Sequence, residues 1–282
     1  MTVTLLGAAE IRALAAELDV TPTKKWGQNF VVDANTVRKI VHLARVADAD
    51  RVVEIGPGLG SLTLAILETG ATVTAVEIDR RLAQRLPQTA ADHGVREGAL
   101  DVIPEDALRV TELPAQPEVL VANLPYNVSV PVLLHFLETF PHLQRGVVMV
   151  QAEVGERLAA PPGSKTYGAP SAKAAWWGSW RLAGTVSRQV FWPVPNVDSV
   201  LVAFERHEQP LAGEDERRRT FAIVDAAFQQ RRKMLRQALA TLMGGSAAQA
   251  SAVLEAAGVA PTARGEELSI DQFLGIARAA DR

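Results

Sequence analysis

The chain has 282 residues, of which 48% are hydrophobic and 22% charged, and its formal net charge at pH 7 is −3. This length can bury a full core and a smaller second unit, and the bulk charge does not indicate a polyanionic partner. The absence of cysteine excludes disulfides, thiolate metal sites and cysteine nucleophiles. The five histidines show no ligand spacing, so we predict no metal site. Without a signal peptide or a membrane-length apolar run, we expect a cytoplasmic protein, by default a monomer.

Strand-like and helix-like segments alternate from about residue 36 to residue 160. RVVEI (51–55) precedes a glycine-rich turn and the helix-like SLTLAILETG, and TVTAVEI (72–78) precedes the helix-like DRRLAQRLPQTAADHG. Three more strands are predicted in LDVIPED, EVLVAN and GVVMVQ. This alternation predicts an α/β fold with a mostly parallel sheet and helices on both faces. In such a sheet, ligands bind outside the carboxyl ends of the strands.

The pattern changes in the second half of the chain. TVSRQVFWPV (185–194) and DSVLVAFER (198–206) are separated by a short connection and predict an antiparallel pair that closes the sheet. EQPLAGEDE (208–216) reads as a linker, and the residues after it have helical periodicity. We therefore predict two domains, 1–207 and 208–282, the second all-helical. Three tryptophans in an expected helical stretch are predicted to pack against the sheet: Trp176, Trp177 and Trp180.

The glycine-rich turn after the first of these strands predicts a nucleotide-type ligand. Gly56, Gly58 and Gly60 allow a tight turn and close approach of a ligand to the backbone. Their spacing is not that of the dinucleotide fingerprint, and Pro57 lacks an N–H that a pyrophosphate would use. Glu77 ends the next strand, where such folds hold a ribose. Together these features indicate an adenosine-type ligand without a diphosphate, although a generic turn of this fold is the alternative.

The run from Glu54 to Gly60, followed by Glu77, resembles the S-adenosylmethionine site of class I (Rossmann-like) methyltransferases. The resemblance implies that cofactor. Asp106, after the third strand, is placed to accept a hydrogen bond from the adenine amino group, although a lone Asp is often only a cap. Ile78 and Ala107, beside these acidic residues, are assigned to the same site.

The fourth strand ends in Asn-Leu-Pro-Tyr, residues 123–126, which predicts a catalytic motif. It resembles the [DNS]-P-P-Y motif of methyltransferases that act on adenine N6 and related amines. The Asn123 side-chain oxygen and the Leu124 carbonyl can each accept an amino N–H and so direct the nitrogen lone pair at the methyl donor. Asn123 is also expected to lie beside the bound methyl donor. Pro125 holds that carbonyl rigidly, and Tyr126 supplies a face for the base to stack on. The alternative is a strand end with a proline turn and a packing tyrosine.

The segment KKWGQNFVVD (24–33) precedes the first strand and carries a more specific resemblance. It is similar to the GQNF segment that covers the cofactor in ribosomal RNA adenine dimethyltransferases, which implies that role for Gln28, Asn29, Phe30 and Val31. Further motifs follow in the family's order: PGSKTYG, FWPVPNVDSV and FQQRRKML. The chain therefore resembles the bacterial enzymes that dimethylate two adjacent adenosines in the 3′-terminal hairpin loop of small-subunit (16S) rRNA. The resemblance also implies that Phe191 places a second ring against the target base, unless it is an ordinary core residue.

The C-terminal region contains basic residues that predict an RNA-contacting surface. In a helix starting at Arg217, the apolar stripe comprises Phe221, Val224, Phe228, Leu235 and Leu239. A helical projection places Arg218, Gln229, Lys233 and Arg236 together on a different face, with Arg231 and Arg232 beside the stripe. Such a face suits phosphate contacts. A merely solvated face is the alternative.

Two other functions remain open from the sequence. The related large-subunit (23S) rRNA dimethyltransferases of macrolide resistance share the glycine loop and the NLPY motif, although PGSKTYG and the long helical C-terminus favour the small-subunit enzymes. A non-catalytic ribosome assembly factor would keep the fold without turnover, against which the intact Asn123 and Tyr126 argue. A dehydrogenase is disfavoured by the glycine spacing, and a small-molecule methyltransferase by the basic helix.

Overall fold

The computed structural model describes residues 2–20, 29–125 and 128–281, and its packing divides the chain into two compact units. The first comprises residues 1–155 and 181–206, and the second comprises 156–180 and 207–282. The sheet unit, as we call the first, carries these elements: α1 (Ala8–Glu17), β1 (Phe30–Val31), α2 (Ala34–Leu43), β2 (Arg51–Ile55), α3 (Ser61–Leu67), β3 (Thr72–Val76), α4 (Arg80–Asp92), β4 (Leu100–Ile103), β5 (Val119–Asn123), α5 (Ser129–Thr139), β6 (Arg145–Gln151), η1 (Arg188–Val190), β8 (Phe191–Trp192) and β9 (Ser199–Arg206).

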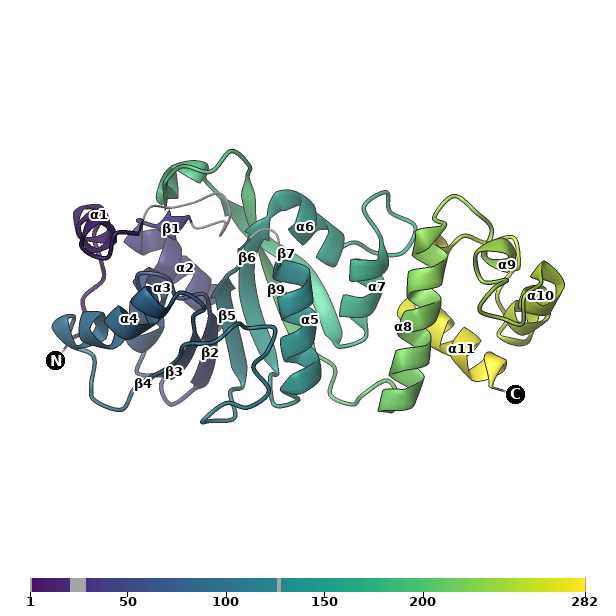
Figure 1. Ribbon diagram of the computed structural model, residues 1–282, viewed down its shortest axis with the longest axis horizontal. Coiled ribbons are helices and arrows are strands. Elements are labelled where there is room, and N and C mark those ends of the chain that lie inside the picture. The colour runs from purple at the N-terminus through teal and green to yellow at the C-terminus, as the bar shows by residue number, and fades with distance from the viewer. Residues whose placement is uncertain (1, 21–28, 126–127, 282) are drawn as a thin grey trace. The chain divides into compact units, whose positions relative to one another are not determined.

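Seven strands form the main sheet in the order β4-β3-β2-β5-β6-β9-β7, where β7 is Gly178–Val186. Strands β2 to β6 pair in parallel, and β9 pairs antiparallel with β6. The central strands are almost entirely buried because helices flank the sheet (Figure 1). This confirms the predicted α/β class, and the carboxyl ends of the parallel strands form one edge.

The closing strands differ from the sequence-based prediction. The strand next to β9 is β7, which begins at Gly178, whereas Phe191 and Trp192 leave the main sheet and pair antiparallel with β1. Prolines at 193 and 195 lack the N–H that a longer ladder there would need. The expectation for the tryptophans is also wrong in part. Trp180 lies in a strand rather than a helix, and Trp176 packs in the core of the other unit.

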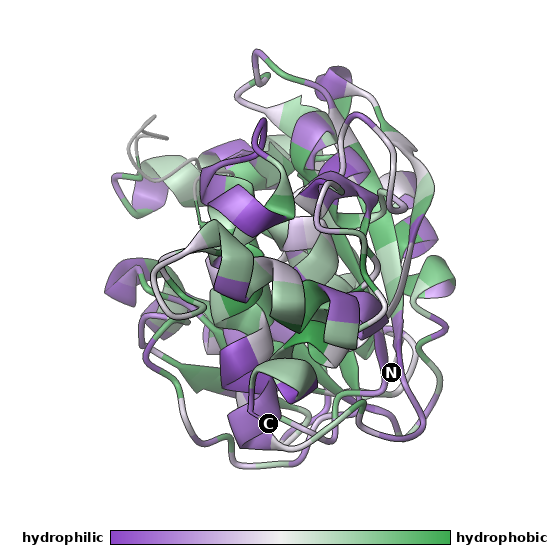
Figure 2. Ribbon diagram, turned by 90° about the vertical axis from the view of Figure 1, so that its right-hand side faces the viewer, coloured by the Kyte–Doolittle hydropathy of each residue, from purple (hydrophilic) through white to green (hydrophobic). Residues whose placement is uncertain are grey.

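The helical unit, as we call the second, is built from α6 (Ala152–Leu158) in part, α7 (Ala169–Ala175), α8 (Glu214–Gln229), α9 (Leu235–Ala238), α10 (Ala247–Ala256), η2 (Gly265–Glu267) and α11 (Ile270–Ala280). Its helices carry both hydrophilic and hydrophobic residues (Figure 2). Residues 156–180 belong here and not with residues 1–155, in contrast to the expected division at 207 and 208. The buried Tyr167 hydroxyl, for example, donates to the Leu268 carbonyl at 2.8 Å. No described helix is long and apolar enough to cross a membrane.

The long helix expected from Arg217 onward is interrupted. Helix α8 ends at Gln229, and α9 starts only at Leu235. The intervening residues contain neither glycine nor proline, so tertiary contacts decide the break. Arg231 pairs with Glu266 at 2.8 Å, and the Leu235 N–H donates to the Ala263 carbonyl at 2.7 Å. The predicted apolar stripe still enters the core of this unit, but the basic residues do not share one helix face.

Candidate functional site

The glycine-rich turn joins β2 to α3 in a conformation that requires glycine. Gly56, Gly58 and Gly60 have φ values of +70°, +59° and +100°, which L-residues rarely adopt. A Cβ atom on Gly58 would lie 3.0 Å from the Phe30 ring, and one on Gly60 would lie 2.8 Å from Leu86. Gly58 therefore admits the Phe30 ring, whereas Gly60 serves the packing of α3 on α4.

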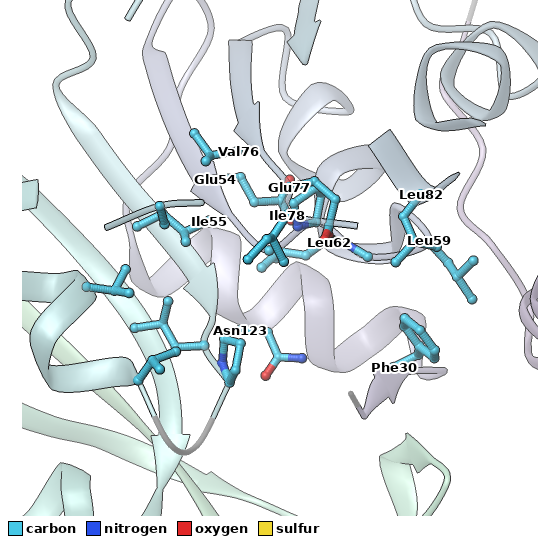
Figure 3. A pocket seen from close by; sticks show the side chains of 18 of the residues that line it. Phe30, Glu54, Ile55, Leu59, Leu62, Val76, Glu77, Ile78, Leu82 and Asn123 are labelled. Carbon is cyan, nitrogen blue, oxygen red and sulfur yellow. Dashed lines mark hydrogen bonds between the residues drawn. The ribbon is translucent and has the colours of Figure 1, made fainter. Parts of the chain in front are cut away.

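A pocket of about 270 Å³ opens at the carboxyl ends of β2, β3 and β5 (Figure 3). All the cofactor residues expected from the sequence line it except Gly60 and Gln28, and Gln28 lies outside the described residues. The expected residues in its lining are Asn29, Phe30, Val31, Glu54, Gly56, Gly58, Glu77, Ile78, Asp106, Ala107 and Asn123, with Leu124 and Pro125 beside them.

Glu77 is held firmly at the end of β3. Its carboxylate accepts hydrogen bonds from the Gly58 N–H at 3.0 Å and the Asp79 N–H at 2.9 Å. The side chain is buried, and burial raises its pKa although these backbone hydrogen bonds oppose the shift. Since each carboxylate oxygen has two lone pairs, Glu77 can still accept the hydroxyls of a bound sugar.

Glu54 is buried in the pocket wall with unused hydrogen-bonding capacity. Burial, assisted by the negative charge of Glu77, raises the pKa of Glu54 to about 8. Its Oε2 atom and the Oγ atom of Ser61 have no hydrogen-bond partner among the described residues, and both residues line the pocket. Buried polar atoms of this kind fit a ligand that supplies the missing donors and acceptors. Ser61 was not singled out from the sequence, because a serine opening a helix is usually only a cap residue.

Apolar walls enclose the end of the pocket near Asp106. Ile78 and Leu108 line it with 46% and 40% of their surfaces exposed. The Asp106 carboxylate accepts from the Leu108 N–H at 3.0 Å, which fixes the loop after β4. Two exposed aliphatic side chains next to an acceptor suit a flat heterocycle that carries an amino group. Leu108 was missed in the sequence because a single leucine in a loop gives no periodic signal.

The NLPY motif begins where β5 ends, and Asn123 is oriented by a specific contact. Its Nδ2 atom donates to the backbone carbonyl of Asn29 at 3.1 Å. A carbonyl can only accept, so the amide nitrogen faces Asn29 and the amide oxygen is directed elsewhere. The Leu124 N–H is bonded to the Met149 carbonyl of β6 at 3.0 Å, and its side chain is buried. Tyr126 lies outside the described residues.

Residues 30 and 31 lie beside the pocket because β1 pairs with β8. Phe30 is opposite Trp192 and Val31 opposite Phe191 in this two-stranded sheet. The rings of Phe30 and Trp192 stack at 6.4 Å with an interplanar angle of 23°. Phe191, by contrast, is 2% exposed in the core of the sheet unit and does not line the pocket. Its expected place against a target base stays a prediction, and its burial also agrees with the alternative of an ordinary core residue.

The predicted RNA-contacting residues differ in ion pairing and in exposure. Arg218 pairs with Glu214 at 2.8 Å, and Arg231 is bound to Glu266 and to the Lys165 carbonyl. Arg232 and Lys233 are exposed in the turn after α8, and Arg236 is partly buried in α9. The described residues contain no cluster of His, Asp or Glu that could hold a metal ion.

Comparisons with known proteins relate the chain to methyltransferases whose names give different RNA substrates. The family model described as "Ribosomal RNA adenine dimethylase" matches residues 21–282. "Ribosomal RNA small subunit methyltransferase A" of Leifsonia xyli subsp. xyli is 66% identical over 274 residues, covering 97% of this chain and 98% of the relative. A dimethyladenosine transferase from Plasmodium falciparum matches with a TM-score of 0.73 at 25% identity, over 86% of this chain and 94% of that one. The 23S rRNA methyltransferase ErmE matches with a TM-score of 0.67 at 25% identity, over 90% and 100%.

Proposed function

The chain belongs to the ribosomal RNA adenine dimethylase family, and we propose that it transfers methyl groups from S-adenosylmethionine to N6 of two adjacent adenosines in the 3′-terminal hairpin loop of small-subunit (16S) rRNA. It is an rRNA methyltransferase by its family. The small-subunit substrate follows the printed name of relatives that match nearly its whole length. Its place of action is then the cytoplasm, where ribosomal subunits are found.

The pocket fits S-adenosylmethionine in the chemistry of its lining. Glu77 would accept the ribose hydroxyls, and Asp106 would accept the adenine amino group between Ile78 and Leu108. The unpartnered Glu54 and Ser61 atoms, beside the glycine turn, suit the polar amino acid end of the cofactor. Gln28, Asn29, Phe30 and Val31 would cover it. When bound, the cofactor supplies an electrophilic methyl carbon on a sulfonium.

The single observation that carries the proposed chemistry is the orientation of Asn123. With its nitrogen bound to the Asn29 carbonyl, the amide oxygen is the group that can accept an N–H of the adenine amino group. The Leu124 carbonyl, held by Pro125, accepts the other N–H, and Tyr126 would stack on the base. The nitrogen lone pair then forms the bond to the methyl carbon as the carbon–sulfur bond breaks and its electron pair stays on sulfur. The methylated nitrogen releases its proton to water. Rate enhancement comes from position and preorganised acceptors.

The target base must leave any stack to reach such a pocket, which favours a hairpin loop. We assign the RNA contacts to residues 208–282, which belong to the helical unit, and methyl transfer to the sheet unit. Arg232 and Lys233 are both exposed in the turn after α8, and we assign Arg218, Arg231 and Arg236 as further phosphate contacts. In the assay described next, Arg232→Ala with Lys233→Ala should raise the subunit concentration needed for transfer and reduce its salt dependence.

Methyl transfer to small ribosomal subunits that lack the hairpin-loop methylations tests the proposal. Labelled S-adenosylmethionine is supplied to wild type and to Asn123→Ala, and the RNA is digested to nucleosides. We expect N6,N6-dimethyladenosine from wild type and a loss of about 100-fold or more in the variant, as for removal of one positioned hydrogen-bonding group.

Two results would overturn the proposal. Label on large-subunit RNA alone would assign the chain to the activity named for ErmE. Binding to small subunits without any transfer would make it an assembly factor. Asn196→Ala, in the loop after β8 and away from the pocket lining, serves as the matched amide control.

A further inference from the structure

The two-stranded sheet β1–β8 connects the FWPVP segment to the catalytic amide. The Val32 N–H donates to the Val190 carbonyl at 2.8 Å, and Phe30 and Val31 pair with Trp192 and Phe191. Residues 30–32 are therefore held along their whole length by residues 190–192. Asn29, immediately before this paired segment, presents its carbonyl to Asn123.

The Phe30 ring gives this sheet a defined position against the pocket. One side of the ring lies close to Gly58, where a Cβ atom would be 3.0 Å away. The ring also stacks on Trp192, which is partly buried against the same apolar cluster as Phe30, Leu59 and Leu82. Phe30 is thus packed between the glycine turn and the Trp192 indole. This packing holds the backbone at Phe30, and with it the preceding residue, Asn29.

The position of the Asn29 carbonyl matters because it decides how the side-chain amide of Asn123 is oriented. A terminal amide has two orientations, and only the one with nitrogen toward Asn29 leaves the oxygen for the substrate amine. Figure 3 shows the Asn123 amide extending from the end of its strand toward the segment that carries Phe30. Displacing the Asn29 carbonyl would remove the contact that selects between the two orientations of the Asn123 amide.

We propose that the β1–β8 sheet sets the orientation of the Asn123 amide through the Asn29 carbonyl, and that Trp192 is a positioning residue for methyl transfer. The inference rests on the proposed function. It extends that function to an aromatic residue that touches neither the pocket nor the reacting atoms, and it explains why position 123 carries an amide: a carboxylate would face the Asn29 carbonyl with no proton to donate.

A double-mutant cycle between Trp192 and Asn123 tests this link. Single-turnover methyl transfer is measured at saturating S-adenosylmethionine for wild type, Trp192→Ala, Asn123→Ala and the double variant, with slow variants followed over hours. We expect Trp192→Ala to slow transfer by about tenfold or more, as for a small misplacement of a reacting group. In the Asn123→Ala background the same change should cost little, because the amide it positions is gone. Trp192→Phe, which keeps a stacking ring, should restore most of the rate.

The controls separate this role from folding and from cofactor binding. Val194→Ala alters a 62% exposed apolar residue of the same segment and should leave the rate unchanged. Calorimetric titration with S-adenosylmethionine shows whether Trp192→Ala changes affinity instead. Equal slowing in both backgrounds, or a change in affinity with an unchanged rate at saturation, would overturn the inference. If wild type itself transfers no methyl group, the proposed function has failed rather than this link.

The Asn123→Asp variant provides a second test of the inference that leaves Trp192 unchanged. A protonated carboxylic acid can donate to the Asn29 carbonyl and accept with its other oxygen, whereas the carboxylate cannot. The pocket's other carboxyl groups, Glu54, Glu77, Glu105 and Asp106, disfavour the added charge. The rate of this variant relative to wild type should therefore rise as the pH falls from about 8 to about 5, and a flat ratio would overturn the inference.

Discussion

Two glutamates, one in each unit, show how differently the same side chain is used in this protein. In the sheet unit, burial beside Glu77 raises the pKa of Glu54 to about 8. In the helical unit, hydrogen bonds from Arg217 and then Arg218 lower the pKa of Glu214 to about 2. The first carboxyl lines the pocket with an oxygen that lacks a partner among the described residues, and the second lies in a surface ion pair. The pocket therefore keeps polar groups at a cost in stability, whereas the helical unit uses them for stability.

The largest change in stability that bears on this comparison is expected from Glu54→Gln. Between pH 4.5 and 8 the native protein holds a proton that the unfolded chain has released, so wild-type stability falls as the pH rises through this range. Each unit of pKa corresponds to ~1.4 kcal/mol, so the variant should lose a pH dependence of a few kcal/mol. Urea unfolding at about pH 5 and about pH 8 measures it. Glu105→Gln, an exposed side chain on the same pocket, is the control, and parallel pH curves for wild type and Glu54→Gln would contradict the expectation.

A smaller effect, confined to the sheet unit, is expected from Gly58→Ala. The new methyl group would meet the Phe30 ring at 3.0 Å, in a backbone conformation with φ of +59°. The strain costs about 1–2 kcal/mol, and the displaced ring should weaken S-adenosylmethionine binding by about tenfold or more. Gly98→Ala carries similar strain at φ of +74° but meets nothing within 4 Å. Calorimetry should show unchanged affinity for this control, and equal affinity losses in both variants would assign the effect to strain alone.

The smallest effect is expected from Glu214→Gln in the helical unit. A carboxyl with a lowered pKa stabilises the native state above its unfolded pKa of 4.5, and the stabilisation is lost as the pH falls toward 2. Because the Glu214 side chain is 47% exposed, solvent screening limits the loss to about 1 kcal/mol at neutral pH. Thermal unfolding in low and high salt measures it, with the exposed Glu208→Gln as control. A loss as large at pH 2 as at pH 7 would show that the ion pairs are not responsible.

The local sequence pattern was sufficient to predict much of the sheet unit. The alternation of strands and helices predicted the parallel sheet, because the periodicity of each element is visible in consecutive residues. Gly58 and Glu77 could likewise be placed together from the sequence, since the carboxyl ends of adjacent parallel strands share one edge. The structure places the two within a hydrogen bond.

Tertiary packing decided what the local pattern left open. Nothing in the sequence around Phe191 states that its ring enters the core while Trp192 stacks on Phe30, because that choice depends on pairing with a strand about 160 residues away. The break between α8 and α9 likewise follows from contacts with Ala263 and Glu266, not from helix propensity. The chain by itself therefore determined the family, the class of fold and the residue types of the pocket. The orientation of the Asn123 amide came only from the folded structure, because it depends on where the Asn29 backbone carbonyl lies, which residue types do not indicate.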